Sequence, residues 1–140
     1  MILAGGQVVG TFDYGPAYPM VAFAADGKTL DATFGNGGVV NVPNSNLFIP
    51  NIFVDDQNRV LVPTTTMGYL ESVLRYTANG ALDPSFGTAG KATLSIPSDL
   101  SLGTTGALAA RVQSGGRIVL LSYAYSSNSQ NVVVLSRLWN

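Results

Sequence analysis

Hydrophobic residues along this chain fall in short runs, many of them alternating with polar residues, and Gly, Pro, Asn, Asp or Ser bound these runs. Alternation with a period of two in short segments is typical of β-strands, and the bounding residues favour turns. The pattern predicts strands near residues 2–6, 20–25, 38–42, 48–54, 59–65, 72–77, 91–96, 106–113, 117–124 and 131–139. We therefore expect an all-β protein.

Four dipeptides predict where the chain turns between these strands. Asn58-Arg59 and Gly115-Gly116 are signals for tight hairpins that join neighbouring strands. Asp26-Gly27 and Asn79-Gly80 are Asx-Gly pairs, in which the Asx side chain bonds the backbone and Gly supplies a positive φ. Both Asx-Gly turns lead directly into the clearest repeat of the sequence.

One segment occurs twice, at residues 30–38 and 82–90, and we call it the linker motif. Leu, Asp, Phe and two Gly coincide between the copies, at an offset of 52 residues. Two further segments recur at longer offsets: residues 54–62 as 112–120, and residues 73–76 as 135–138. Loops tolerate insertions better than strands do, so the changing offset indicates loops of unequal length.

The repeat divides the chain into units of four strands. We expect one repeat domain in which residues 1–37 form a partial unit and its linker, 38–89 a full unit and its linker, and 90–140 a second full unit. Four-stranded units joined by a fixed motif are typical of β-propeller blades. The expected fold is a series of propeller-like blades made of four-stranded antiparallel sheets, about two and a half blades per chain.

The linker motif, the Arg-bearing strand and the hairpin Gly-Arg-Ile-Val at residues 116–119 resemble delta-60 repeats, a propeller-type repeat of bacterial secreted and surface proteins. The resemblance implies an architecture and an extracellular or cell-surface setting, and it implies no activity. A propeller typically has four to eight blades, roughly twice what this chain supplies or more. We therefore expect a homo-oligomer, or blades that belong to a larger propeller.

The motif residues have structural interpretations. Phe34 and Phe86 are expected to pack between adjacent units, and Asp31 and Asp83 to cap turns by bonding backbone N–H groups. The recurring glycines are expected to permit positive φ or a close backbone approach, and they are Gly35, Gly38, Gly87 and Gly90. Arg75 and Arg137 lie at matching positions on apolar strands, where an Arg is expected to be paired or to cap carbonyls; the alternative is that they line a binding face.

Charged residues make up only 11% of the chain, against roughly 25% in typical soluble domains. The net charge is −1 and no stretch concentrates Lys or Arg, which argues against a nucleic-acid partner and against an anionic membrane surface. No apolar run approaches the roughly 20 residues of a membrane span, so no membrane insertion is expected. The N-terminal residues 1–6 lack a basic segment and their apolar run is short, so we do not expect them to form a signal peptide.

The chain contains no Cys and no His, which removes disulfides, thiolate metal sites, the commonest metal ligand and the commonest general base. Asp55 and Asp56 are adjacent, and neighbours on a strand point to opposite faces, so they do not form an acid–base pair. Gly27-Lys28-Thr29 ends like a nucleotide loop, but Ala22 stands where the loop needs its first Gly. We expect no catalytic site, metal or cofactor; the remaining alternative is a fragment of a hydrolase or lyase that uses Asp, Glu71, Tyr and Arg.

The aromatic residues of loops and strand ends are the best indication of a ligand. They are Tyr14, Tyr18, Tyr69, Tyr123, Tyr125 and Trp139. Flat apolar rings beside Asn, Ser and Thr suit contacts with carbohydrate or protein, although such rings also fasten loops to strands. The sequence thus favours a non-catalytic structural or interaction module, with a carbohydrate-binding lectin as the alternative.

Overall fold

The computed structural model describes residues 2–5, 17–43, 47–48, 52–66, 70–95, 106–113, 116–125 and 131–138, and no α-helix occurs among them. The strands are β1 Ile2–Gly5, β2 Ala17–Phe23, β3 Val39–Pro43, β4 Leu47–Phe48, β5 Phe53–Val54, β6 Val60–Thr66, β7 Leu70–Tyr76, β8 Lys91–Ser95, β9 Gly106–Val112, β10 Ile118–Tyr125 and β11 Asn131–Leu138. The all-β prediction is confirmed. The segment predicted as one strand at 48–54 contains two short strands, β4 and β5.

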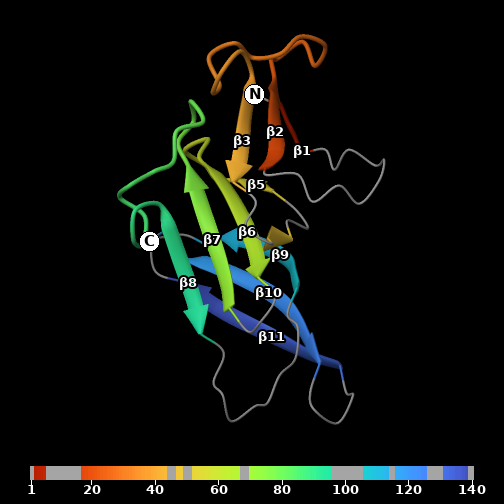
Figure 1. Cartoon of the computed structure of the whole chain (residues 1–140), viewed down its shortest axis with the longest axis vertical. Helices are drawn as coiled ribbons and strands as arrows, with labels where there is room; N and C mark the ends of the chain where they lie inside the picture. Colours follow the sequence, from red (N-terminus) through yellow and green to blue (C-terminus); the bar gives the residue numbers. More distant parts are fainter. Residues whose placement is uncertain are drawn as a thin grey trace.

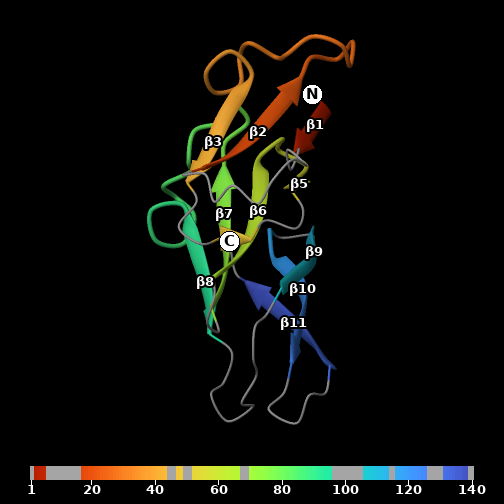
Figure 2. The ribbon, with the colours of Figure 1, turned by 45° about the vertical axis from the view of Figure 1, so that its right-hand side comes forward.

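Three antiparallel sheets contain these strands and follow one another along the longest axis of the molecule (Figures 1 and 2). The first sheet has the order β1-β2-β3, and the third has the order β11-β10-β9. The second sheet has the order β4-β6-β7-β8, with β5 also paired to β6. Because β4 pairs with the end of β6 and β5 with its beginning, the two occupy one side of β6 like an interrupted strand.

The linker motif turns the chain within a sheet, so the strand after each linker pairs with the strand before it. β3 pairs with β2, with Val39 opposite Val21, and β8 pairs with β7, with Lys91 opposite Leu74. The chain therefore passes to the next sheet after Pro43 and after Ser95, not at residues 38 and 90. A repeated motif marks equivalent places but does not say with which neighbour the next strand pairs, so the division at residues 38 and 90 did not predict this pairing.

Two hydrophobic clusters hold the sheets together, one on each face of the second sheet. Successive β6 residues point to opposite faces, so Val60 and Val62 lie in the cluster with the first sheet, and Leu61 lies in the cluster with the third. Phe34 is fully buried in the first of these clusters and Phe86 in the second. Each linker phenylalanine thus packs between two adjacent sheets.

The sequence repeat corresponds to a repeat of strand register. Leu61 lies opposite Arg75 in the second sheet, and Val119 lies opposite Arg137 in the third. Leu3 lies opposite Ala22 at the equivalent place of the first sheet. These matched pairs define which residues of the three sheets are equivalent.

The first Asx-Gly turn is one residue longer than the second. Ala24 N–H donates to Thr29 O at 2.9 Å, five residues on, whereas Thr77 N–H donates to Ala81 O at 2.8 Å, four residues on. Ala22 and Arg75, on the strands before the two turns, are 53 residues apart, whereas the two linkers are 52 residues apart. The extra residue of the first turn explains this difference.

The glycine after Phe86 provides a test of the linker geometry. Gly87 has φ +55°, and a Cβ there would lie 2.2 Å from Lys91 O, whereas Gly37 has φ +60° with no atom within 4 Å of its Cβ position. We expect Gly37→Ala to cost about 1 kcal/mol, from the left-handed backbone alone. Gly87→Ala should cost at least about 3 kcal/mol, because the clash adds to that strain. Urea unfolding of the two variants checks this; equal losses would contradict the close approach.

Candidate functional site

The two linkers dock onto the preceding strand with the same backbone hydrogen bonds. In the second sheet, Asp83 N–H donates to Arg75 O at 2.8 Å, and Arg75 N–H donates to Gly90 O at 3.0 Å. Ala22 makes the same two bonds in the first sheet, with Asp31 N–H and with the final glycine of its linker, at 2.9 Å each. The linker is therefore a fixed structural unit that attaches along the edge of β2 or β7.

Each linker aspartate closes its own turn. Asp83 accepts hydrogen bonds from the Ser85 hydroxyl at 2.6 Å and from the Ser85 N–H at 3.1 Å. Asp31 accepts the corresponding bonds from Thr33, at 2.5 Å and 3.0 Å. Hydrogen bonds from these hydroxyl and amide groups hold the pKa of both carboxyls below their ordinary value. Both aspartates thus have the turn-capping role that the sequence predicted.

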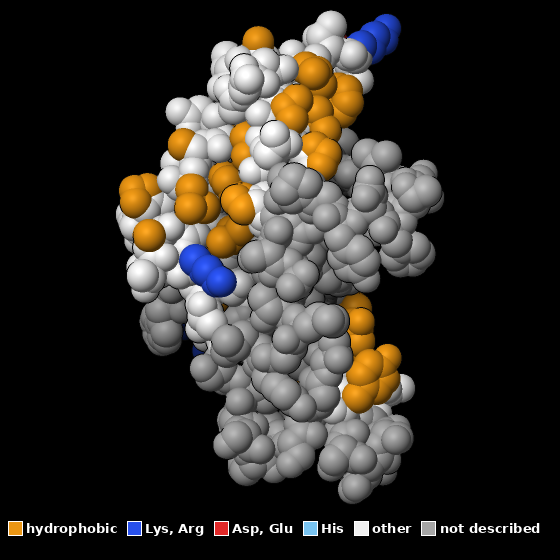
Figure 3. Space-filling model, viewed as in Figure 1, with side chains coloured by type: hydrophobic (Ala, Val, Ile, Leu, Met, Phe, Trp, Pro, Cys, Tyr) orange, Lys and Arg blue, Asp and Glu red, His pale blue; other side chains and the backbone are white. Residues whose placement is uncertain are grey.

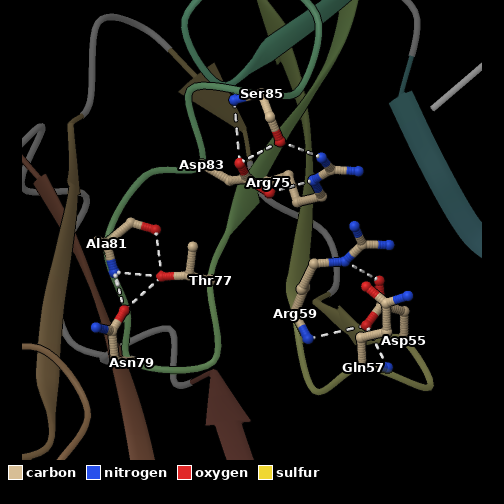
Figure 4. A network of polar contacts seen from close by, with 9 residues as sticks. All are labelled: Asp55, Gln57, Arg59, Arg75, Thr77, Asn79, Ala81, Asp83 and Ser85. Carbon is tan, nitrogen blue, oxygen red and sulfur yellow. Dashed lines mark hydrogen bonds and ion pairs between the residues drawn. The ribbon is translucent and has the colours of Figure 1, made fainter.

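Arg75 joins the second linker to its sheet through three contacts. Its Nε donates to Asp83 Oδ2 at 2.8 Å, its Nη2 donates to Ser85 Oγ at 3.1 Å, and its guanidinium carbon lies 4.5 Å from the centre of the Phe86 ring. Figure 4 shows the ion pair and the serine contact together. Arg75 is only 3% exposed, and its Nη1 is buried without a hydrogen-bond partner among the described residues. A buried guanidinium of this kind depends on its carboxylate partner.

The first linker lacks this arginine. Ala22 occupies the place of Arg75, so Asp31 closes its turn without an ion pair among the described residues. The two copies therefore share their backbone and their aspartate cap but differ in one buried charge pair. That difference offers a matched control within the same molecule.

A second ion pair lies in the hairpin between β5 and β6 (Figure 4). Asp55 Oδ2 lies 2.6 Å from Arg59 Nε, and Asp55 Oδ1 accepts the N–H groups of Gln57 and Arg59 at 2.9 Å each. Asp55 is buried, and the tight turn aims three donors at its carboxylate. Asn58 supplies the left-handed residue of this turn, with φ 58°.

Arg137 is equivalent to Arg75 in register but is exposed. It lies on what we call the outer face of the third sheet, the face turned away from the second sheet. This face contains Val119, Leu121 and Tyr123 of β10 and Val133, Leu135 and Arg137 of β11. Val133 is 69% exposed and Leu135 is 71% exposed, whereas Leu61 and Val73 at places equivalent to Val119 and Leu135 are fully buried.

Of the aromatic residues predicted as ligand contacts, the described part of the chain brings two together, Tyr123 and Tyr125. Tyr14, Tyr69 and Trp139 lie outside the described residues, and Tyr18 is placed in β2 by its backbone alone. Tyr123 and Tyr125 lie on β10 with ring centres 5.8 Å apart and planes at 82°. Their edge-to-face packing gives the outer face an aromatic end.

A small cleft of about 220 Å³ lies between the β5 hairpin and β9. Phe53 and Val112 contribute apolar walls, and Asp56, Arg111 and Gln113 contribute polar groups. Within the described ranges, no three His, Cys, Asp or Glu side chains come together in a way that could hold a metal ion. The described residues also contain no helix that is long and apolar enough to cross a membrane.

Two contacts of the linker were not predicted from the sequence. The hydroxyls of Thr33 and Ser85 donate hydrogen bonds to the linker aspartates, and the Arg75 guanidinium stacks on Phe86. A signal for the hydroxyls was present, because Asp is followed by Thr or Ser two residues later in both copies. The stacking had no local signal, since the strand and the linker meet only in the folded sheet.

A scan against protein-family models and searches of curated proteins and solved structures find no match for this chain. The resemblance to delta-60 repeats therefore stays a prediction that rests on the linker motif and the hairpin.

Proposed function

We propose that this chain is a non-catalytic interaction module: consecutive blades of a propeller-type repeat from a bacterial secreted or surface protein, which self-assemble or belong to a larger propeller. One observation carries the proposal. The outer face of the third sheet exposes Val133 and Leu135, whereas Val73, at the place equivalent to Leu135, is buried by the next sheet. A sheet face of this kind is complete only when another sheet covers it.

The stacking of the three sheets supports this proposal. Both faces of the second sheet are covered, one by the first sheet and one by the third. The second sheet, with its interrupted first strand followed by β6, β7 and β8, has the meandering order expected of a blade. Full burial of a Val or Leu side chain contributes about 1.5–3 kcal/mol each, so covering Val133 and Leu135 favours association.

The opposite end of the stack offers a complementary surface, and hydrophobic side chains are visible over the first sheet in Figure 3. Val21, Phe23 and Val39 lie on the face of the first sheet that points away from the second, and each is partly exposed. Contact between this face and the outer face of the third sheet would repeat the two interfaces already present. Such head-to-tail contacts close into rings or extend as filaments.

Light scattering coupled to size-exclusion chromatography tests this proposal. We expect a mass that is a multiple of the monomer mass, and we expect Leu135→Asp to reduce it, because a charge on the outer face opposes burial. Val54→Asp is the control, since Val54 is also exposed, at 45%, but lies on β5 outside that face. A protein that is monomeric at all concentrations, with or without Leu135→Asp, would contradict self-assembly through this face.

A further inference from the structure

One edge of β11 is unpaired among the described residues, since β10 lies on its other side. The equivalent strands of the other sheets, β2 and β7, pair on that side with the strand that follows a linker. In the described part of the chain, the third sheet therefore presents a strand equivalent to β7 with neither a linker nor a fourth strand beside it.

The backbone of β11 is arranged to receive such a segment. Arg137 lies opposite Val119 as Arg75 lies opposite Leu61, so its N–H and C=O point away from β10. In the second sheet the same two groups of Arg75 bond Gly90 and Asp83 of the linker. An exposed strand edge of this kind binds an added strand through main-chain hydrogen bonds.

The side chains of β11 complete the resemblance to β7. Arg137 has no ion-pair partner among the described residues. At the equivalent place in β7, the Arg75 guanidinium contacts Asp83, Ser85 and Phe86 of the linker. Leu135 stands where Val73 packs in one cluster with Phe86. A linker phenylalanine placed in the same way would cover the exposed Leu135 and the guanidinium plane of Arg137.

We propose that the edge of β11, with the outer face of the third sheet, is a binding site for a polypeptide segment that carries a linker motif. The segment has the form Asp-x-Ser/Thr-Phe-Gly-x-x-Gly followed by a β-strand, and its aspartate pairs with Arg137. This inference rests on the proposed function, because it names the partner that completes the third sheet. Two occupied examples within the chain, at β2 and at β7, define the chemistry of the segment.

A synthetic peptide of residues 82–95 tests the site, because it contains the second linker and β8. Fluorescence anisotropy would follow binding of the labelled peptide to the intact protein and to Arg137→Ala, whose exposed side chain can be removed without opening the core. We expect saturable binding that weakens about tenfold in Arg137→Ala. Peptides carrying Asp83→Asn should lose this dependence on Arg137, and peptides carrying Phe86→Ala should bind more weakly to both proteins.

Three outcomes would overturn the site. They are no binding, equal binding of a scrambled peptide, and equal binding of the Asp83→Asn peptide to the unaltered protein; the last indicates unspecific strand addition. The mass measurement separates this inference from the proposed function. An oligomer that Leu135→Asp disrupts, together with failure of the peptide, retains the interaction module and rejects the linker site. A monomer that binds the peptide through Arg137 rejects self-assembly and retains the site.

Discussion

Replacing Phe86 by alanine is expected to lower the free energy of unfolding by about 3–5 kcal/mol. Phe86 is fully buried between the second and third sheets, where it lies in one cluster with Leu61, Ile118 and Leu120. Removal of the ring loses the transfer free energy of its atoms and leaves a cavity between two sheets. It also takes away the surface on which the Arg75 guanidinium stacks. Against a typical total of about 5–15 kcal/mol, this loss is a large fraction of the stability of the protein.

Urea unfolding monitored by circular dichroism measures this effect. Phe34→Ala should produce a loss of similar size, because Phe34 is equally buried in the other cluster. Tyr125→Ala is the control, since Tyr125 is 47% exposed, and it should cost less than about 1 kcal/mol. If Phe86→Ala and Tyr125→Ala unfolded at the same urea concentration, Phe86 would not hold the sheets together.

The second large effect is expected at Asp83. Asp83→Ala leaves the buried guanidinium of Arg75 without its carboxylate, and breaking a buried pair in this way costs about 3–5 kcal/mol. Asp31→Ala removes the same turn cap from the first linker, where Ala22 stands in the place of the arginine. It should cost distinctly less than Asp83→Ala, because the hydrogen bonds of Asp31 are exposed to solvent and no buried charge loses its partner. The difference between the two variants isolates the contribution of the buried charge, and equal losses would contradict it.

The same residue gives a pH dependence whose sign is defined. The Ser85 hydroxyl, followed by the Ser85 amide and Arg75, lowers the pKa of Asp83 from its ordinary value of 3.8 in the folded protein. The stabilisation is therefore complete above pH 3.8 and is lost as the pH falls through the lower folded pKa. The stability difference between the unaltered protein and Asp83→Asn should shrink in that acidic range. A difference that stays constant down to the lowest pH at which the protein folds would show that Asp83 does not titrate with folding.

Much of the local structure was determined by the sequence itself. Period-two alternation predicted the strands, because a half-buried strand must alternate apolar and polar side chains. The Asx-Gly pairs predicted the turns before both linkers, where Gly27 and Gly80 have positive φ. The recurring Phe and Asp predicted the packing between sheets and the turn caps, since each role depends on residue type and on contacts nearby in the chain.

Only the tertiary structure decided which strands pair, which face is covered and which arginine is buried. The linker sequence is the same whether the strand after it joins the preceding sheet or starts the next one. The pairing of β3 with β2 and of β8 with β7 therefore depends on hydrogen bonds between strands that the linker sequence does not specify. Arg75 and Arg137 match in sequence, yet one is buried beside Asp83 and the other is exposed. The physical reason is that burial depends on a neighbouring segment: a linker and a further sheet cover Arg75, and no described residue pairs with Arg137.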